Sequence, residues 1–296
     1  MKKSGKPLVI LIPLAAMLVL AIVSAGCIDE ISPLPDEVKI KGNVISVDSS
    51  LMPSDVIMNL LFSPNEYEKE AFEAVEKYVP PDDPVVEVGV GPGTLAAYIN
   101  QHLRIKTDHI AFESNPYLLP LLEKTKATNQ LGTRFINGAV AYGSDTVPVS
   151  ITKNFLESNI SPTRSEETVD VPAHTLRKTV AESDFLDKTC VTVVVEINDV
   201  WKDILTNEPD LADFVSTFIV ATWNISQDDR EILLKKTRNA GFSSTYVSDT
   251  GKNGLEVFVF TRDDSLSENG ITEEIPSSDS SSSSGSSSSS PESVSR

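Results

Sequence analysis

Short apolar runs alternate with amphipathic stretches through the middle of the chain, from about residue 38 to residue 262. The apolar runs are rich in valine and isoleucine, which is typical of strands buried in a parallel sheet. Five such strands are predicted, at residues 85–88, 109–112, 133–140, 190–197 and 214–222. Two further strands, at 242–247 and 255–261, are separated by a turn-rich stretch too short for a crossover helix. They are expected to form an antiparallel hairpin.

Helical periodicity separates most of these strands. Helices are predicted over residues 65–79, 94–103, 117–129 and from Ser226 to a closing Gly241. Ser63 is expected to cap the first helix, and Ser226 to cap the last one, which docks through residues 232–234. Strands that alternate with helices and end in a hairpin predict an α/β fold, a three-layer doubly wound Rossmann-like sheet that is mostly parallel. A ligand is then expected at the carboxyl ends of the strands.

Composition narrows the classes of function. The 296 residues carry 25 Lys and Arg against 43 Asp and Glu, a net charge of −18, with two cysteines and three histidines. A charge this negative repels phosphate backbones, so no nucleic-acid partner is expected. Two cysteines can form only one disulfide, which is too few to stabilise a chain of this length, and the histidines show no metal-ligand spacing. A disulfide scaffold and a metal site are therefore not predicted.

The first 28 residues predict a membrane signal. Three lysines, the last at Lys6, precede an uncharged stretch over residues 7–28. At about 1.5 Å per residue this stretch is long enough to cross the roughly 30 Å hydrocarbon core as a helix. Small residues just before Cys27 resemble a lipoprotein cleavage box, which would make Cys27 a lipidation site. An uncleaved anchor is the open alternative, and both readings tether the chain to a membrane.

The charge pattern around this segment predicts where the body lies. Lysines precede the apolar stretch, and Asp29 and Glu30 follow it, so the positive-inside rule favours an extracytoplasmic body, with the cytoplasmic face left open. Residues 29–53 are assigned to a linker and lead-in, and residues 54–262 to the folded domain. Residues 263–296 are acidic and dominated by serine, and such a composition predicts a disordered tail.

A glycine-rich turn follows the strand at residues 85–88. It reads Glu87-x-Gly89-x-Gly91-x-Gly93. A dinucleotide fingerprint, G-x-G-x-x-G, needs its third glycine at the position of Thr94, so the spacing here favours a nucleoside ligand without pyrophosphate. Glu113 ends the next strand, where a carboxylate can accept hydrogen bonds from both ribose hydroxyls. The alternatives are that the glycines only make a tight turn and that Glu113 caps the next helix.

Residues 85–93 look like the first motif of class I S-adenosylmethionine-dependent methyltransferases, and the chain more specifically resembles the FkbM family. Residues 111–116, Ala-Phe-Glu-Ser-Asn-Pro, are similar to that family's A-F-E-x-N-P stretch, and residues 136–141 to its third-strand motif. The resemblance covers roughly residues 54–262. It implies S-adenosylmethionine as the cofactor, with the following residues binding it: Glu87, Gly89, Gly91, Gly93, Glu113 and Asn137. Within that set the glycines would line its methionine and ribose portions and Asn137 would face the adenine.

The chain departs from the family around the fourth strand. The family shows K-I-D-x-E-G-x-E, and here Glu196 keeps a carboxylate while Asn198 and Asp199 replace an acid and the glycine. Transfer to a hydroxyl needs a group that takes or orients its proton, and Glu196 and His174 are the catalytic candidates. The alternatives are a solvent-facing His174 in a loop and a strand-end Glu196 satisfied by a backbone amide. Residues 145–180 are expected to add two short strands around a loop at residues 161–164 that recognises the acceptor.

Two functions follow from these observations. The first is a membrane-tethered methyltransferase that uses S-adenosylmethionine and acts on a hydroxyl of a small molecule, a glycan or a lipid-linked acceptor. The second is a non-catalytic methyltransferase-like binding module displayed at the cell surface. Intact cofactor glycines favour the enzyme, and the altered fourth-strand motif favours the binding module.

Overall fold

The computed structural model describes residues 35–64, 66–151, 167–185, 190–248, 251 and 254–262. The predicted anchor with Cys27, the expected acceptor loop at residues 161–164 and the predicted tail at residues 263–296 lie outside these residues. Within the described part of the chain, no helix is both long and apolar enough to cross a membrane.

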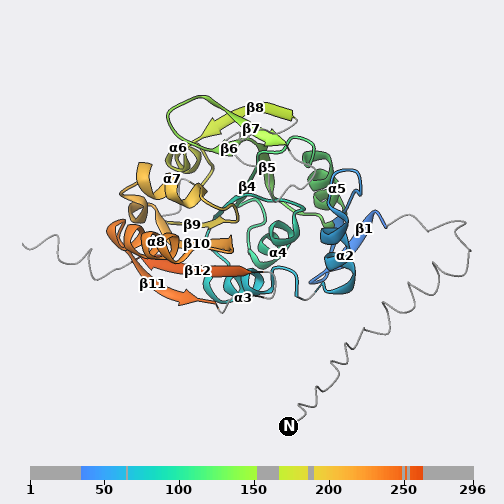
Figure 1. The fold of residues 1–296 in the computed structure, drawn as a ribbon, viewed down its shortest axis with the longest axis horizontal. Coiled ribbons are helices and arrows are strands. Elements are labelled where there is room, and N and C mark those ends of the chain that lie inside the picture. The colour runs from blue at the N-terminus through green and yellow to red at the C-terminus, as the bar shows by residue number, and fades with distance from the viewer. Residues whose placement is uncertain are drawn as a thin grey trace, which may run out of the picture. The chain divides into compact units, whose positions relative to one another are not determined.

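A seven-stranded sheet forms the centre of the molecule (Figure 1). In spatial order its strands are β11 (Phe242–Val247), β12 (Leu255–Arg262), β10 (Val215–Trp223), β9 (Val191–Val195), β3 (Val85–Val88), β4 (His109–Glu113) and β5 (Arg134–Asn137). The five strands from β10 to β5 are parallel, and β12 runs antiparallel to both of its neighbours. The predicted fold class, a mostly parallel doubly wound sheet ending in an antiparallel hairpin, is confirmed.

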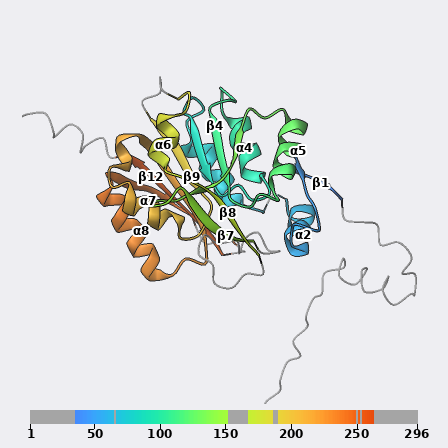
Figure 2. The same cartoon turned by 90° about the horizontal axis from the view of Figure 1, so that it is seen from above.

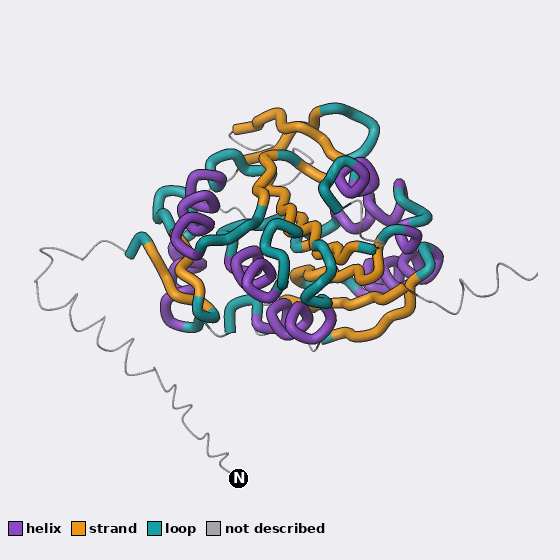
Figure 3. The backbone as a smooth tube through the Cα atoms, turned by 180° about the vertical axis from the view of Figure 1, so that it is seen from behind, coloured by secondary structure: helices purple, strands orange, loops and turns teal. Residues whose placement is uncertain are grey.

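Helices cover both faces of this sheet and make three layers, which Figure 3 shows from behind. One face carries α3 (Lys69–Tyr78), α4 (Thr94–His102) and α5 (Leu119–Asn129), and the other carries α6 (Leu176–Ala181), α7 (Val200–Asn207) and α8 (Gln227–Asn239). Successive strand residues point to opposite layers: Val194 packs with the first set and Val195 with the second. Strands such as β9 therefore consist almost entirely of apolar residues.

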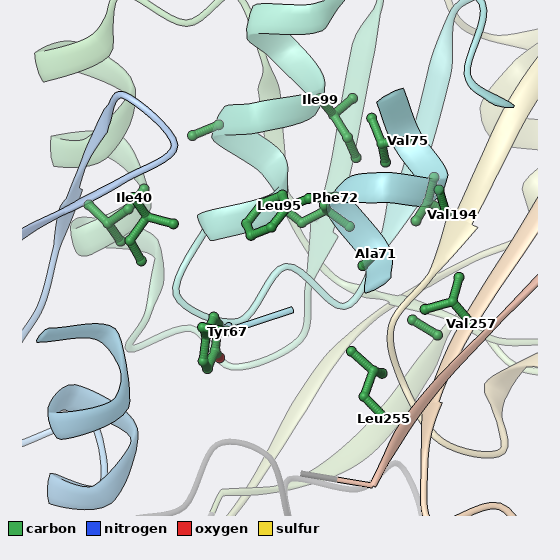
Figure 4. Packing of buried hydrophobic residues seen from close by; sticks show 14 of the residues in the cluster. Ile40, Tyr67, Ala71, Phe72, Val75, Leu95, Ile99, Val194, Leu255 and Val257 are labelled. Atoms are coloured by element: carbon green, nitrogen blue, oxygen red, sulfur yellow. The ribbon is translucent and has the colours of Figure 1, made fainter. Parts of the chain in front are cut away.

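Aromatic and aliphatic side chains from α3 and α4 fill the core on the first face (Figure 4). Phe72 is fully buried, and its ring meets the edge of Tyr98 with centroids 5.0 Å apart. Burying such a ring contributes about 1.5–3 kcal/mol. Leu95 and Ile99 lie beside Phe72, and Val194 lies across from them on the sheet. This packing fixes the start of α4, and with it the glycine turn that leads into α4.

The predicted helix at residues 65–79 starts too early. The carbonyl of Ser63 accepts bonds from the amides of Glu66 and Tyr67, so a turn separates α3 from an unpredicted helix, α2 (Ser54–Phe62). Ser63 is the C-cap of α2, and Glu68, in a left-handed conformation at φ 50°, is the N-cap of α3. The predicted cap role of Ser63 is therefore wrong, because the chain reverses between the two helices. The predicted cap at Ser226 is confirmed: its hydroxyl accepts from the Asp229 amide at 3.1 Å.

The predicted strand at residues 133–140 is in fact two strands in different sheets. It divides at Gly138, where a Cβ would lie only 2.8 Å from the His174 ring. After β5, the short strand β6 (Ala139–Val140) joins a second sheet with β8 (Glu167–His174) and β7 (Thr146–Ile151). These last two are the pair of strands expected in the inserted region, and Figure 2 shows them crossing the main sheet.

A hairpin of β1 (Glu37–Ile40) and β2 (Asn43–Ser46) precedes α2, in the stretch assigned to a linker from its sequence. Lys41 and Gly42 form its turn with φ values of 49° and 87°, the left-handed pair that a two-residue hairpin prefers. Ile40 and Ile45 are buried in the first-face core. The Ser46 amide donates to Oγ1 of Thr125 on α5 at 3.0 Å, which ties the hairpin to the domain.

Candidate functional site

Glu113 and the glycine turn meet where β3 and β4 end side by side. The Gly91 amide donates to Oε2 of Glu113 at 2.9 Å, and the Asn115 amide donates to Oε1 at 2.7 Å. The Glu113 side chain is nearly enclosed, with the residue 6% exposed. Parallel pairing places the ends of both strands at one edge of the sheet, so residues 22 positions apart come into contact. The predicted pairing of glycine turn and acid is therefore present in the fold.

All three glycines of the turn adopt left-handed backbone conformations, with φ values of 94°, 53° and 83° for Gly89, Gly91 and Gly93. Two of them also lie against protein side chains. A Cβ at Gly89 would lie 2.2 Å from Cγ1 of Ile197, and one at Gly93 would lie 2.7 Å from Cδ2 of Leu122. The turn and its packing therefore require glycine at these two positions, whether or not the turn binds a cofactor.

Buried carboxyl groups surround the turn. Glu68 is 4% exposed at the start of α3, and its Oε2 accepts from the Thr94 hydroxyl at 2.5 Å. Burial raises the pKa of Glu68 to about 7, against the opposing effect of that hydrogen bond. Burial likewise raises the pKa of Glu113 to about 7, although the Asn115 and Gly91 amides favour its charged form. Near neutral pH both groups are therefore only partly ionised.

Glu196 follows β9 and adds a third acid to this group. Its amide donates to the Val88 carbonyl at 2.8 Å, and its Oε1 is buried without a hydrogen-bond partner among the described residues. Burial, and then the charges of Glu68 and Glu87, hold the pKa of Glu196 well above its usual range. This environment favours the protonated form of the Glu196 carboxyl group. No backbone amide among the described residues binds Oε1.

Glu87, the acid that opens the motif, is completely buried within β3. Its Oε2 lies 3.0 Å from Nε2 of His109 on β4, and Nδ1 of the same ring lies 2.9 Å from Oγ1 of Thr133. The other oxygen, Oε1, has no partner among the described residues. Oε2 of Glu87 thus takes part in a contact between β3 and β4. Oε1 is the oxygen that is available to a ligand.

His174 lies at the end of β8 rather than in a loop. Its ring packs against Phe112 with centroids 5.1 Å apart and lies against Gly138, where an added Cβ would be 2.8 Å from the ring. Nε2 is buried and has no hydrogen-bond partner among the described residues. Burial lowers the pKa of His174, and the charge of Lys178 lowers it further, so the ring is neutral at pH 7. A neutral imidazole with an unpartnered nitrogen can accept a proton.

Asn137 lies at the end of β5, next to β4. Its Nδ2 donates to the Glu113 carbonyl at 3.0 Å, and the Gly138 amide donates to the same oxygen at 3.1 Å. Asn137 therefore holds the backbone that carries Glu113, and its side chain remains partly exposed. The structure brings Asn137, Glu113 and the glycine turn together on adjacent strand ends, with His174 on the Gly138 side and Glu196 on the β9 side.

The residues that replace the family's acid and glycine have clear structural roles. Oδ1 of Asn198 accepts from the Thr222 hydroxyl at 2.7 Å and from the Trp223 amide at 2.9 Å, so its side chain is bound to the end of β10. Asp199 has a φ of 70°, a conformation that glycine adopts without strain.

Three residues near the turn could not be predicted from the sequence. They are Glu68, Thr94, whose hydroxyl donates to Glu68, and Ile197. Glu68 falls inside the stretch predicted as helix, where a glutamate normally faces solvent, and only the turn after α2 directs it inward. Ile197 is one apolar residue in a run of them, and nothing in the sequence distinguishes the one that covers Gly89. No pattern signal could have identified these residues, since each depends on contacts between distant segments.

The stability of the chain is expected to fall as the pH rises from about 4.5 to about 7, because the folded chain holds a proton on Glu68 that the unfolded chain releases in this interval. The free energy of unfolding then stays level above pH 7 as far as this group is concerned. Glu68→Gln removes the titration while keeping the shape, so it should lessen the decline by on the order of 3 kcal/mol. Urea denaturation at pH 4.5, 6 and 8 measures it.

The matched control is Glu123→Gln on α5, where the side chain is 56% exposed. This variant reports the effect of removing one surface charge. A Glu68→Gln variant whose pH profile coincides with that of Glu123→Gln would show that burial of Glu68 carries no proton linkage.

Comparisons with known proteins find similarity in solved structures. The ribosomal protein L11 methylase of Lactobacillus delbrueckii subsp. bulgaricus aligns over 68% of this chain and 80% of its own, with 12% identity and a TM-score of 0.41. Precorrin-6y C5,15-methyltransferase of Geobacter metallireducens aligns over 74% and 94%, with 9% identity and a TM-score of 0.41. TYW2 of M. jannaschii, in complex with AdoMet, aligns over 79% and 90%, with 12% identity and a TM-score of 0.42.

No protein-family model matches this sequence. A comparison with curated proteins finds no relative. The strand order and the terminal hairpin of the chain itself establish a Rossmann-like, methyltransferase-type α/β fold.

Proposed function

We propose that this chain is an S-adenosylmethionine-dependent methyltransferase whose cofactor binds at the carboxyl ends of β3 and β4. The observation that carries this proposal is the contact between the Gly91 amide and the Glu113 carboxylate at 2.9 Å. It joins a left-handed glycine turn at the start of a helix to an acid on the neighbouring parallel strand. This is the arrangement that binds the ribose of a nucleoside in doubly wound folds.

The residues around the turn fit this cofactor. A carboxylate offers about four acceptor positions, and the two amides use two of those on Glu113, so both ribose hydroxyls can still donate to it. Glu87 and Glu196 each have a buried oxygen without a hydrogen-bond partner among the described residues, and these oxygens are available to polar groups of a ligand. S-adenosylmethionine supplies an electrophilic methyl group on a positively charged sulfur.

Proton handling by the chain favours His174 over Glu196. A proton acceptor has to be unprotonated at the working pH. His174 meets this condition at pH 7 because burial lowers its pKa, whereas the pKa of Glu196 is raised. We therefore assign proton acceptance to Nε2 of His174. Glu196 is assigned to the orientation of a bound group through the hydrogen bond that its carboxyl donates when it is protonated, the form that burial favours.

The finer features of the proposal come from the sequence. The acceptor is a hydroxyl of a small molecule, a glycan or a lipid-linked compound, and residues 1–28 tether the enzyme to a membrane. Membership of the FkbM family is part of the same proposal. It is supported by the A-F-E-S-N-P stretch, which falls on the end of β4 and the turn after it, and by the glycine-like conformation of Asp199.

A second candidate is the non-catalytic binding module at the cell surface. Two observations favour it. The side chain that stands at the family's acid position, Asn198, is bound to β10, and Ile197 covers Gly89. A scaffold that had lost its cofactor would tolerate both features.

Calorimetric titration of the full chain in detergent with S-adenosylmethionine separates the two candidates. A methyltransferase is expected to bind the cofactor with a Kd in the micromolar range, about −8 kcal/mol. Adenosine alone should bind more weakly, since it lacks the charged portion. A folded chain that takes up no S-adenosylmethionine would leave the binding module as the function.

A further inference from the structure

Two large apolar side chains project into solvent from one edge of α2. Phe62 is 74% exposed and Met58 is 44% exposed, and they are four residues apart, so they lie on the same face of the helix. The other large exposed apolar residues in the described part of the chain are Ile105 and Tyr117, in separate turns, and Ile232 on α8. Scattered single residues need no explanation, whereas a paired aromatic and methionine on one helix edge suggest a contact surface.

This edge lies close to the point where the predicted membrane segment joins the fold. Helix α2 contacts β1, and both lie at the same end of the molecule in Figures 1 and 2. Residues 29–36 separate the uncharged stretch from β1. Fully extended, eight residues span at most roughly 30 Å. If residues 1–28 tether the chain as proposed, β1 begins within that distance of the membrane surface, and α2 lies against β1.

Helix α2 itself carries little charge. Its one charged side chain is Asp55, in its first turn. The hairpin that α2 contacts exposes Lys39 and Lys41, and the acids at its entrance, Asp36 and Glu37, both pair with Lys124 at 3.4 and 3.3 Å. An exposed apolar pair on a helix with one charged residue favours the interface of a bilayer.

We propose that the Met58–Phe62 edge of α2 is a membrane-contact surface, which inserts its side chains into the interfacial region of the bilayer that tethers the chain. The contact orients the body on the membrane, since α2 then faces the lipid and α8, at the opposite end of the sheet, faces away (Figures 1 and 2). The proposal is independent of methyl transfer, because it concerns a surface and not the strand ends that carry Glu113.

Photo-crosslinking tests the surface directly. The full chain, with Phe62 replaced by p-benzoylphenylalanine, is reconstituted in vesicles of phosphatidylcholine and phosphatidylglycerol, irradiated and analysed for lipid adducts by mass spectrometry. The same replacement at Ile232 is the matched control, since that residue is apolar, 41% exposed and on α8. We expect at least ten times more lipid adduct at position 62 than at position 232. Replacement at Met58 should behave like replacement at Phe62.

Three results would overturn the proposal. They are equal adduct yields at positions 62 and 232, an absence of adduct at position 62 in chains that float with the vesicles, and a full chain that does not float with them. Because Phe62 is mostly exposed, the replacement should not disturb the fold, and circular dichroism of each variant confirms this.

Discussion

Glu113→Ala is expected to weaken the binding of S-adenosylmethionine about 10³-fold, which corresponds to about 4 kcal/mol. The variant removes the proposed acceptor for both ribose hydroxyls, and hydrogen bonds to a charged group contribute about 1.5–3 kcal/mol each. It also removes the partner of the Gly91 amide, so the turn that follows β3 is held less firmly. Calorimetric titration of the full chain measures the change in Kd.

Two further variants make this result interpretable. Glu113→Gln keeps the size of the side chain and one oxygen that can accept from an amide, so it should fold normally and show a smaller loss of affinity. Glu123→Ala, an exposed carboxylate on α5, should bind the cofactor like the original chain. Unchanged affinity in a folded Glu113→Gln or Glu113→Ala variant would remove Glu113 from the site.

Gly89→Ala is expected to lower the free energy of unfolding by about 4 kcal/mol. A left-handed conformation costs a residue with a Cβ roughly 1–2 kcal/mol, and Gly89 has a φ of 94°. The new methyl group would also lie 2.2 Å from Cγ1 of Ile197, and overpacking of this kind costs about 1–3 kcal/mol. Urea denaturation followed by circular dichroism gives the difference.

A control glycine separates the two causes. Gly42 has a φ of 87°, and a Cβ there would meet no atom within 4 Å, so Gly42→Ala should show the conformational cost alone. Gly89→Ala should cost less stability in an Ile197→Ala background than in the original chain, because the smaller side chain leaves room for the methyl group. If Gly42→Ala and Gly89→Ala were equally destabilising, the contact with Ile197 would have no energetic weight.

The parts of the fold that depend on local pattern could be predicted from the sequence. Strands β3, β4 and β9 are runs of apolar residues within a few residues of their predicted bounds, and the Ser226 cap begins α8 as expected. The hairpin of β11 and β12 follows from a connection too short for a helix. In each case the residues that determine the element are neighbours in the chain.

The prediction fails where distant segments decide the structure. Gly138 divides the strand predicted at residues 133–140, and the His174 ring, from another strand, occupies the space beside it. Thr125 and Asn129 of α5 accept hydrogen bonds from the backbone of the β1–β2 hairpin and stabilise it. The sequence of residues 37–46 does not predict these partners. Ile232, expected to dock with its neighbours, is exposed, and of the three only Leu233 is fully buried.

The same division applies to the candidate site. Glycine spacing and an acid at a strand end are local signals, and they led to Glu113 and Gly91, which are in contact. Glu68 is different, since a helix pattern places a glutamate in solvent unless the chain before the helix turns it inward. The acids that change the electrostatics of the glycine turn become neighbours only when the fold has formed.

The position of β12 has a consequence for how the protein is made. This strand is the final described element of the chain, yet it lies between β10 and β11 and pairs with both. During synthesis the earlier elements emerge first, and β10 keeps one bare edge until residues 255–262 arrive. A bare edge invites pairing with other chains. The growing polypeptide therefore depends on its last described strand for protection against aggregation, because β10 is not covered until that strand has been synthesised.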